Sequence, residues 1–236
     1  VMARGKVLYE GHAVAAVAAM TDAVAAAAVD LIVVTYEVLP HVIDVEEAMA
    51  PGAPILHDDL FTAGITPKPT TASNVAKKVR FTIGDVEAGF KAADVIIEQR
   101  YTTAPVHQAY IEPHACVAAW SADGQCTVIA SSQGHFMIRS YCAKLLGIDV
   151  AAIRVVNAEI GGGFGGKTTV YLEPLAVALA RQSGRPVKLV MTRAEVFKAT
   201  GPTSGTHVWV KIGATRDGKL TAGEMVLKYQ AGAFPG

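Results

Sequence analysis

The sequence predicts an α+β protein made of two parts, and three observations carry this prediction. Short segments in which apolar and polar residues alternate, such as 95–101, predict strands. Segments such as 135–146 instead place apolar residues at the three- and four-residue spacing of a helix. Residues 51–70 are rich in proline and glycine, so they predict an irregular linker between residues 1–50 and residues 71–236.

The first part is expected to be a small α/β unit. Residues 5–10 and 13–19 predict two short strands, and 32–38 predicts a third that ends before Pro40. Thr21 or Asp22 is a suitable N-cap for an alanine-rich helix over 23–31.

The second part alternates strands and helices. Asp85 is expected to cap a short helix that ends at residue 92, Gly147 to end the helix 135–146, and residues 121–124 to form a hairpin turn. The other expected helices are 169–183 and 194–199. The expected strands are 77–83, 95–101, 110–120, 126–131, 154–160, 185–192, 207–215 and 220–229, the last two forming a long hairpin.

Composition excludes several classes of protein. Hydrophobic residues make up 51% of the 236 residues, which is enough for a sizeable core. Lysine plus arginine equals aspartate plus glutamate at 21 each, so charge gives no reason to propose nucleic acid or an anionic membrane as partner.

Cysteine usage and hydropathy predict a cytoplasmic protein. The three cysteines, Cys116, Cys126 and Cys142, have no CxxC spacing and are expected to be buried, reduced thiols. The sequence does not start like a signal peptide, and Asp22 and Asp30 interrupt its most apolar early stretch, residues 13–34.

The most informative stretch is the glycine loop, residues 161–168, with the sequence GGGFGGKT. It has five glycines in six residues and lies between a predicted strand and a predicted helix. Glycine is favoured where the backbone needs a positive φ or must approach another group closely. The loop is therefore expected to cradle a ligand.

Two general nucleotide motifs fit these letters. GxxxxGKT from Gly161 to Thr168 matches a phosphate loop, and GxGxxG from Gly161 to Gly166 matches a dinucleotide fingerprint. Each motif lacks its acidic partner, because the next predicted strand is followed by Arg193 instead. A phosphate-loop nucleotide hydrolase remains an alternative hypothesis.

A more specific signal is a resemblance to a known family. The string EIGGGFGGK, residues 159–167, resembles the molybdopterin-binding large subunit of the xanthine oxidase and aldehyde oxidoreductase family. Further segments resemble the same family in the same order along nearly the whole chain: 6–15, 36–40, 84–90, 107–114, 131–133, 184–188 and 192–195.

The resemblance implies a fold and a cofactor. Residues 1–50 would be most of a hammerhead-like α/β domain, and 71–236 the N-terminal part of a molybdopterin-binding α+β domain. The implied cofactor is molybdopterin carrying molybdenum, expected in its cytosine dinucleotide form. Molybdenum is held by the pterin dithiolene, so no metal-ligating side chain is predicted. The implied cofactor-binding residues are Gly162, Gly163, Phe164, Gly165, Gly166 and Gln133.

The resemblance also implies an enzyme, a molybdenum hydroxylase that oxidises an aldehyde, an N-heterocycle or a related small molecule. Gln133 is the implied catalytic residue, because the family's glutamine donates a hydrogen bond to the apical oxo ligand. Electrons would leave through partner subunits that carry a 2Fe–2S cluster and FAD.

Two departures from the family pattern matter. Some purine-oxidising members have glutamate where this chain has Thr168, which favours a substrate other than a purine. The family's subunit is several times longer, and its general-base glutamate lies in the C-terminal part, which is therefore an expected partner. The alternative is a non-catalytic half of a split or truncated subunit that needs a second chain.

The remaining polar residues are given structural roles. Glu112 is expected to bond backbone N–H groups, and Lys167 either to neutralise a cofactor phosphate or to start the next helix. The spacing of His107, His114 and His135 fits no compact metal site, so these are expected to be interface residues or hydrogen-bonded polar residues.

Overall fold

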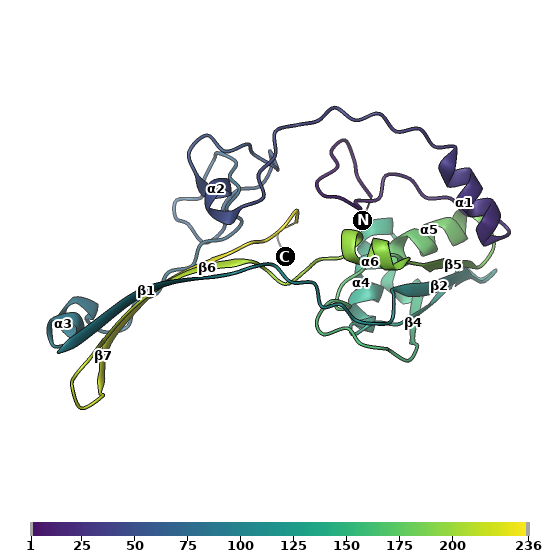
Figure 1. Ribbon diagram of the computed structural model, residues 1–236. Helices are drawn as coiled ribbons and strands as arrows, with labels where there is room; N and C mark the ends of the chain where they lie inside the picture. Colours follow the sequence, from purple (N-terminus) through teal and green to yellow (C-terminus); the bar gives the residue numbers. More distant parts are fainter. Residues whose placement is uncertain (1, 235–236) are drawn as a thin grey trace. The chain divides into compact units, whose positions relative to one another are not determined.

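The computed structural model of the chain describes residues 2–234 (Figure 1). Two compact units result, each from separate segments of the chain. The first joins the residues up to Tyr36 with His107–Pro202, and the second joins Glu37–Val106 with the residues from Thr203 onward. The second unit joins residues from both sides of His107–Pro202, because strand 95–103 pairs with strand 206–214.

The first unit is built on a four-stranded sheet with the order β4-β3-β2-β5. Strand β2 runs antiparallel to β3 and β5, whereas β3 and β4 are parallel neighbours. The parallel pair requires a crossover, which helix α4 and a short 3-10 turn, η1, provide. The elements are β2 (Ala115–Trp120), β3 (Cys126–Ala130), α4 (His135–Leu146), η1 (Val150–Ala152), β4 (Ile153–Asn157) and β5 (Val187–Val190).

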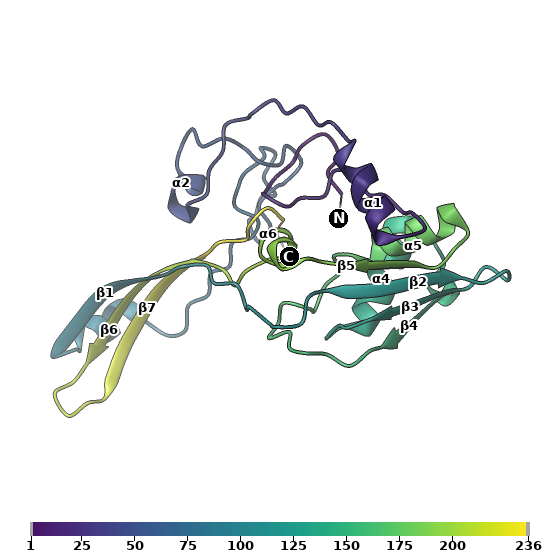
Figure 2. The same ribbon diagram turned by 45° about the vertical axis from the view of Figure 1, so that its right-hand side comes forward.

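Helices α4 and α5 (Glu173–Ser183) pack against one face of this sheet and form the main core (Figure 2). Every second residue of β2 and β3 is buried there, as expected for strands with one covered face. All three cysteines lie in this core as free, buried thiols, as predicted. Helix α4 ends at Gly147 with a φ of 62°, also as predicted.

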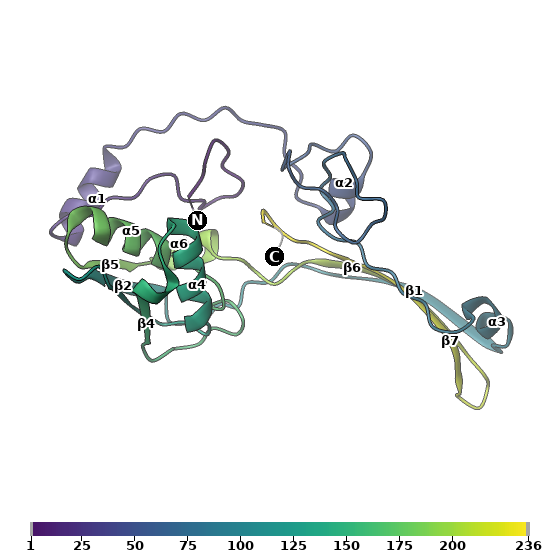
Figure 3. The ribbon, with the colours of Figure 1, turned by 180° about the vertical axis from the view of Figure 1, so that it is seen from behind.

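The second unit contains a three-stranded antiparallel sheet with the order β1-β6-β7. Its strands are β1 (Val95–Thr103), β6 (Thr206–Ala214) and β7 (Leu220–Tyr229), and β6 and β7 form the predicted long hairpin. Helix α3 (Val86–Lys91) packs on this sheet beside β7 (Figure 3). Asp85 caps α3 as predicted, accepting a hydrogen bond from Ala88 N.

Two further predicted helices are present, and the predicted cap of the first is confirmed. Helix α1 (Asp22–Asp30) begins after Thr21, whose side chain accepts a hydrogen bond from Val24 N. Helix α6 (Arg193–Ala199) begins with a capping box, in which the side chains of Thr192 and Glu195 bond each other's backbone N–H groups. Helix α2 (Val45–Met49) was not predicted; Asp44 caps it.

Four of the predicted strands are wrong: 5–10, 13–19, 32–38 and 77–83 are not strands in the structure. Only isolated bridges occur in or beside three of them, and every side chain of 32–38 is exposed. A β-favouring sequence becomes a strand only when another strand supplies a hydrogen-bonding partner, and the described residues supply none here.

Several element boundaries lie inside the predicted ones, three of them by three residues or more. The strand predicted from residue 110 begins at Ala115, the one predicted to 160 ends at Asn157, and the helix predicted from 169 begins at Glu173. Pro174 fixes this helix start, because proline is tolerated only in the first turn of a helix. Among residues 2–234, no helix has the length and apolar character needed to cross a membrane.

Candidate cofactor-binding site

The parallel pairing of β3 and β4 determines where the candidate site lies. Register pairs Ala130 with Asn157, the last residues of the two strands. Parallel neighbours end at the same edge of a sheet, so the segment after β3 and the glycine loop after β4 are brought together. Gln133 and the loop, both predicted site elements, are therefore neighbours in space.

Gln133 makes three hydrogen bonds to the glycine loop. Its Oε1 accepts hydrogen bonds from Gly165 N at 3.0 Å and Lys167 N at 3.2 Å, and its own N donates to Lys167 O at 2.9 Å. Both partners of the side chain are donors, so the atom facing them must be the carbonyl oxygen. The amide Nε2 is thereby turned away from the loop, and no hydrogen bond among the described residues uses it.

The tip of the loop presents further donors. The backbone N–H groups of Gly162, Gly163 and Phe164 take part in no hydrogen bond within residues 2–234. Phe164 has a φ of 49°, a conformation that L-residues rarely adopt, and its side chain is 73% exposed. Successive free N–H groups on a loop suit an anionic ligand.

The glycines of the loop allow a close approach that other residues would prevent. A Cβ on Gly163 would lie 2.5 Å from Gln133 Oε1, and one on Gly166 would lie 2.8 Å from Tyr110 Cε1. The loop therefore needs glycine at these positions to keep its contact with Gln133. With the free N–H groups and the Gln133 amide, this donor set fits an anionic cofactor such as molybdopterin.

Lys167 points into the protein. Its Nζ lies 2.7 Å from Glu112 Oε2 and 4.8 Å from the centre of the Tyr110 ring, and its side chain is 0% exposed. The same Glu112 oxygen accepts a hydrogen bond from Gly161 N at 2.7 Å. Glu112 thus has the predicted structural role.

One of the two predicted roles of Lys167 is wrong, because the next helix starts only at Glu173. The other role, neutralising a cofactor phosphate, stays a prediction; in the structure the ammonium is paired with Glu112. A phosphate loop requires the lysine side chain to extend toward the bound phosphates. The geometry therefore gives no support to the nucleotide-hydrolase alternative.

The carboxyl group of Glu112 is ionised at neutral pH. Burial raises its pKa, but the hydrogen bonds from Lys167 and Gly161 N and the charge of Lys167 together hold the pKa below its ordinary value. The pair is therefore a true ion pair with a buried cation.

A cluster of neutral polar side chains lies beside this pair. Tyr110 OH lies 2.5 Å from His114 Nε2, and His107 Nε2 lies 2.7 Å from Thr200 Oγ1. His107 Nδ1 accepts a hydrogen bond from Ala109 N at 3.0 Å, so Nε2 carries the proton and donates to Thr200. His107 and His114 are thus hydrogen-bonded polar histidines, as predicted.

His114 is held neutral by its surroundings. Burial first, and then the charge of Lys167, lower its pKa from 6.5 to about 4. His135 differs from the prediction, because its Nε2 is buried and has no hydrogen-bond partner among the described residues. Among these residues no group of three histidine, cysteine or acidic side chains could hold a metal ion.

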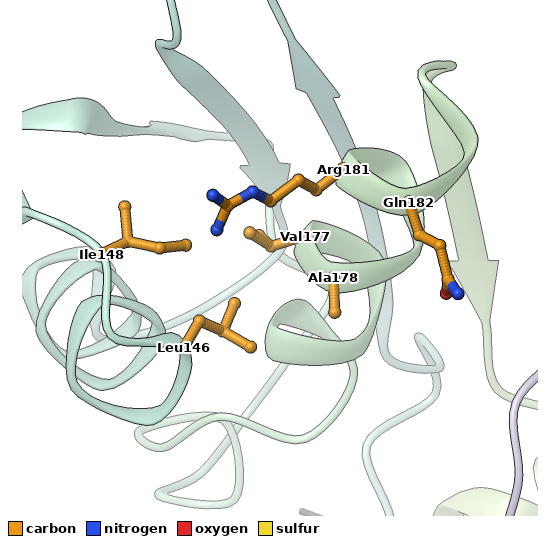
Figure 4. A pocket seen from close by; sticks show the side chains of 6 residues that line it. All are labelled: Leu146, Ile148, Val177, Ala178, Arg181 and Gln182. Atoms are coloured by element: carbon orange, nitrogen blue, oxygen red, sulfur yellow. The ribbon is translucent and has the colours of Figure 1, made fainter.

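A hollow elsewhere in the first unit is not part of this site. It lies where α4 ends, against α5, and the close view shows Leu146, Ile148, Val177, Ala178, Arg181 and Gln182 around it (Figure 4). No residue of the glycine loop lines it. Arg181 also stacks over the Trp120 ring at 5.5 Å, which gives its cation a structural partner.

Comparison with known proteins assigns the family. A family model described as the molybdopterin cofactor-binding domain matches residues 68–236. The chain belongs to this family of molybdopterin-binding large subunits, and the resemblance seen in the sequence is confirmed.

Similar proteins place the chain within longer subunits. It is 34% identical to a probable xanthine dehydrogenase subunit of Bacillus subtilis, over 99% of this chain and 30% of that protein. It is 31% identical to the nicotinate dehydrogenase large molybdopterin subunit of Eubacterium barkeri, over 97% of this chain and 51% of that protein. The chain therefore spans between about a third and a half of these two relatives.

A solved structure shares the fold. Carbon monoxide dehydrogenase from Oligotropha carboxidovorans matches with a TM-score of 0.74 and 31% identity, over 87% of this chain and 26% of that chain. The α+β fold class predicted from the sequence is thereby confirmed.

The close approach of Gly163 to Gln133 predicts that a methyl group added at Gly163 will destabilise the fold. Gly163→Ala should lower the free energy of unfolding by about 1–3 kcal/mol, because its Cβ would press on the Gln133 amide. Gly223→Ala, where a Cβ would meet nothing within 4 Å, is the control and should change it by less than about 0.5 kcal/mol. Urea denaturation measures both, and equal effects would contradict the proposed close contact.

His114 predicts a pH dependence of stability. Its pKa falls from 6.5 in the unfolded chain to about 4 in the folded one, so the unfolded chain binds more protons between these values. Stability contributed by neutral His114 should therefore be lost as pH falls from 6.5 to 4, by on the order of 3 kcal/mol. Denaturation of wild type and His114→Gln across this range checks the slope. An NMR titration midpoint of His114 near 6.5 would contradict the prediction.

Proposed function

We propose that this chain is the cofactor-binding portion of the large subunit of a molybdenum hydroxylase, a molybdopterin-dependent oxidoreductase. One observation carries the proposal: donors that the protein leaves unused lie together at one edge of the sheet. These are the N–H groups at the loop tip and the amide Nε2 of Gln133. Family membership supplies the anionic cofactor that such donors suit.

Each predicted site residue has a distinct task in this proposal. Gly162, Gly163 and Phe164 offer backbone N–H donors to the cofactor. Gly165 and Gly166 keep the backbone close to Gln133 and Tyr110. Gln133 uses Oε1 to hold the loop and Nε2 to donate to the metal end of the cofactor, and a neutral amide does this without adding charge.

When bound, molybdopterin supplies the metal and the redox chemistry of the reaction. The cytosine dinucleotide form, a 2Fe–2S cluster and FAD on partner subunits, and a cytoplasmic location belong to the proposal. They are supported by the resemblance of the chain to large subunits of this family. The protein's own part here is to bind and orient the cofactor.

The proposed substrate is an N-heterocycle, an aldehyde or a related small molecule. One relative is named for xanthine, a purine, and another for nicotinate, a pyridine, and both compounds are N-heterocycles. Thr168 is uncharged, and its Oγ1 donates to Gly165 O at 3.1 Å, so this position offers no carboxylate to a purine. We therefore expect purines to be poorer substrates than other N-heterocycles.

The proposed catalytic base comes from outside this chain. Glu112 is committed to Lys167 and Gly161 N, and buried Glu173 accepts a hydrogen bond from Tyr171 N. Burial raises the pKa of Glu173, but the same burial at the start of α5 shields it from a substrate. The C-terminal part of the same subunit is the proposed source. The second candidate, a cofactor-binding half that needs a separate chain, follows from the same observation.

Metal and pterin analysis tests the function directly. The purified protein, isolated with its partner chains, should contain molybdenum and pterin in equal amounts per large subunit. If this chain binds cofactor only with a second chain, both should appear only when the two are produced together. Magnesium-dependent ATP or GTP binding without pterin would overturn the proposal.

Substitution of Gln133 separates its two tasks. Gln133→Ala should lower kcat by about 100-fold, the typical cost of removing a well-placed donor, while the fold is kept. Gln133→Glu keeps acceptors for Gly165 N and Lys167 N but cannot donate, so it should retain the loop contacts and still lose turnover. Steady-state kinetics with the exposed-turn variant Gln125→Ala as control measure this. Wild-type turnover in Gln133→Glu would refute the donor role.

A further inference from the structure

We propose that Glu112 and Lys167 form a positioning pair, which sets the width of the glycine loop and the direction of the Gln133 amide. This inference rests on the proposed function, because it gives the pair a role in presenting donors to the cofactor. Neither residue touches the donors themselves. They act through the loop and through Gln133.

A single oxygen atom holds both ends of the loop. Glu112 Oε2 lies 2.7 Å from Gly161 N at the first residue and 2.7 Å from Lys167 Nζ at the far end. The three unused N–H groups lie between these two anchors. Removing either anchor would therefore change the curvature of the segment that carries the donors.

Lys167 connects this anchor to Gln133. Its N–H donates to Gln133 Oε1 and its C=O accepts from Gln133 N, so both of its main-chain groups are bound to one residue. Ser132 Oγ donates to the same carbonyl at 3.0 Å. The amide of Gln133 is planar, so any shift of Lys167 N that moves Oε1 also redirects Nε2.

Because the Lys167 ammonium is buried, its contact with Glu112 depends on both groups keeping their charges. The side chain of Lys167 is removed from water, and its ammonium lies against the Glu112 carboxylate and the Tyr110 ring. An unpaired buried charge is strongly unfavourable, so loss of Glu112 should expel the lysine side chain and pull its backbone outward. If the ion pair only stabilised the fold, removing both charges together should leave the loop and the turnover unchanged.

The test compares single and double variants in the purified enzyme with its partner subunits. Lys167→Met and Glu112→Gln each break the pair, whereas Glu112→Gln with Lys167→Met removes both charges and keeps an acceptor for Gly161 N. Lys91→Met breaks the exposed Lys91–Glu87 pair and is the matched control. Hydrogen exchange of peptides covering 161–168, retained molybdopterin, kcat and KM are measured.

We expect the double variant to unfold like wild type and still show loop exchange about 10-fold faster, with kcat about 10-fold lower and KM unchanged. Restoration of both exchange protection and kcat in the double variant would overturn the proposal, since the pair would then only balance its own charge. Exchange is compared between samples of equal molybdopterin content, because bound cofactor would itself protect the loop amides that donate to it. A wild type without molybdopterin would refute the proposed function, and the exchange comparison among the cofactor-free variants would still decide the role of the pair.

Discussion

The parallel pairing of β3 with β4 is the constraint on which the site depends. It is the only parallel pair among the named strands in the described part of the chain. Because the two strands are parallel neighbours, the segments that follow them start side by side. One segment leads to Gln133 and the other to the glycine loop. Helix α4, which makes the crossover between these strands, also supplies part of the core under the sheet. The same connection therefore stabilises the unit and aligns the donors.

Near the loop, one pair of side chains is charged and the neighbouring histidine is neutral. The buried ammonium of Lys167 has one carboxylate partner, Glu112, which stays ionised. The nearby histidine, His114, is kept neutral, with a pKa of about 4, partly because a second cation beside Lys167 would be repelled. The Glu112–Lys167 pair and the neutral His114 thus add no net charge of their own beside the loop. The free N–H groups of such a loop attract an anion through fixed dipoles.

Local signals in the sequence predicted local structure well. Caps at Thr21, Asp85 and Gly147 and the hairpin after residue 207 are decided by neighbouring residues, and all are confirmed. The strand predicted at 32–38 failed because a strand depends on a partner that alternation cannot reveal. The Glu112–Lys167 pair was missed for a similar reason: the two residues are 55 positions apart, and only the fold brings them together. The roles assigned to Gln133 and the loop glycines came from resemblance, and the structure adds the contacts on which they rest.

The direction of one side chain separates two functions that share the same letters. A string of glycines followed by lysine and threonine is compatible with a phosphate loop or with a molybdopterin loop. In the first, the lysine must extend toward the ligand; here it turns inward to Glu112. The buried ammonium pairs with Glu112 and, in our proposal, positions the backbone. In the proposed function, recognition of the cofactor then falls to the N–H groups of the loop and to the neutral amide of Gln133. The burial of Lys167 is thus the feature that favours the proposed cofactor loop over a phosphate loop.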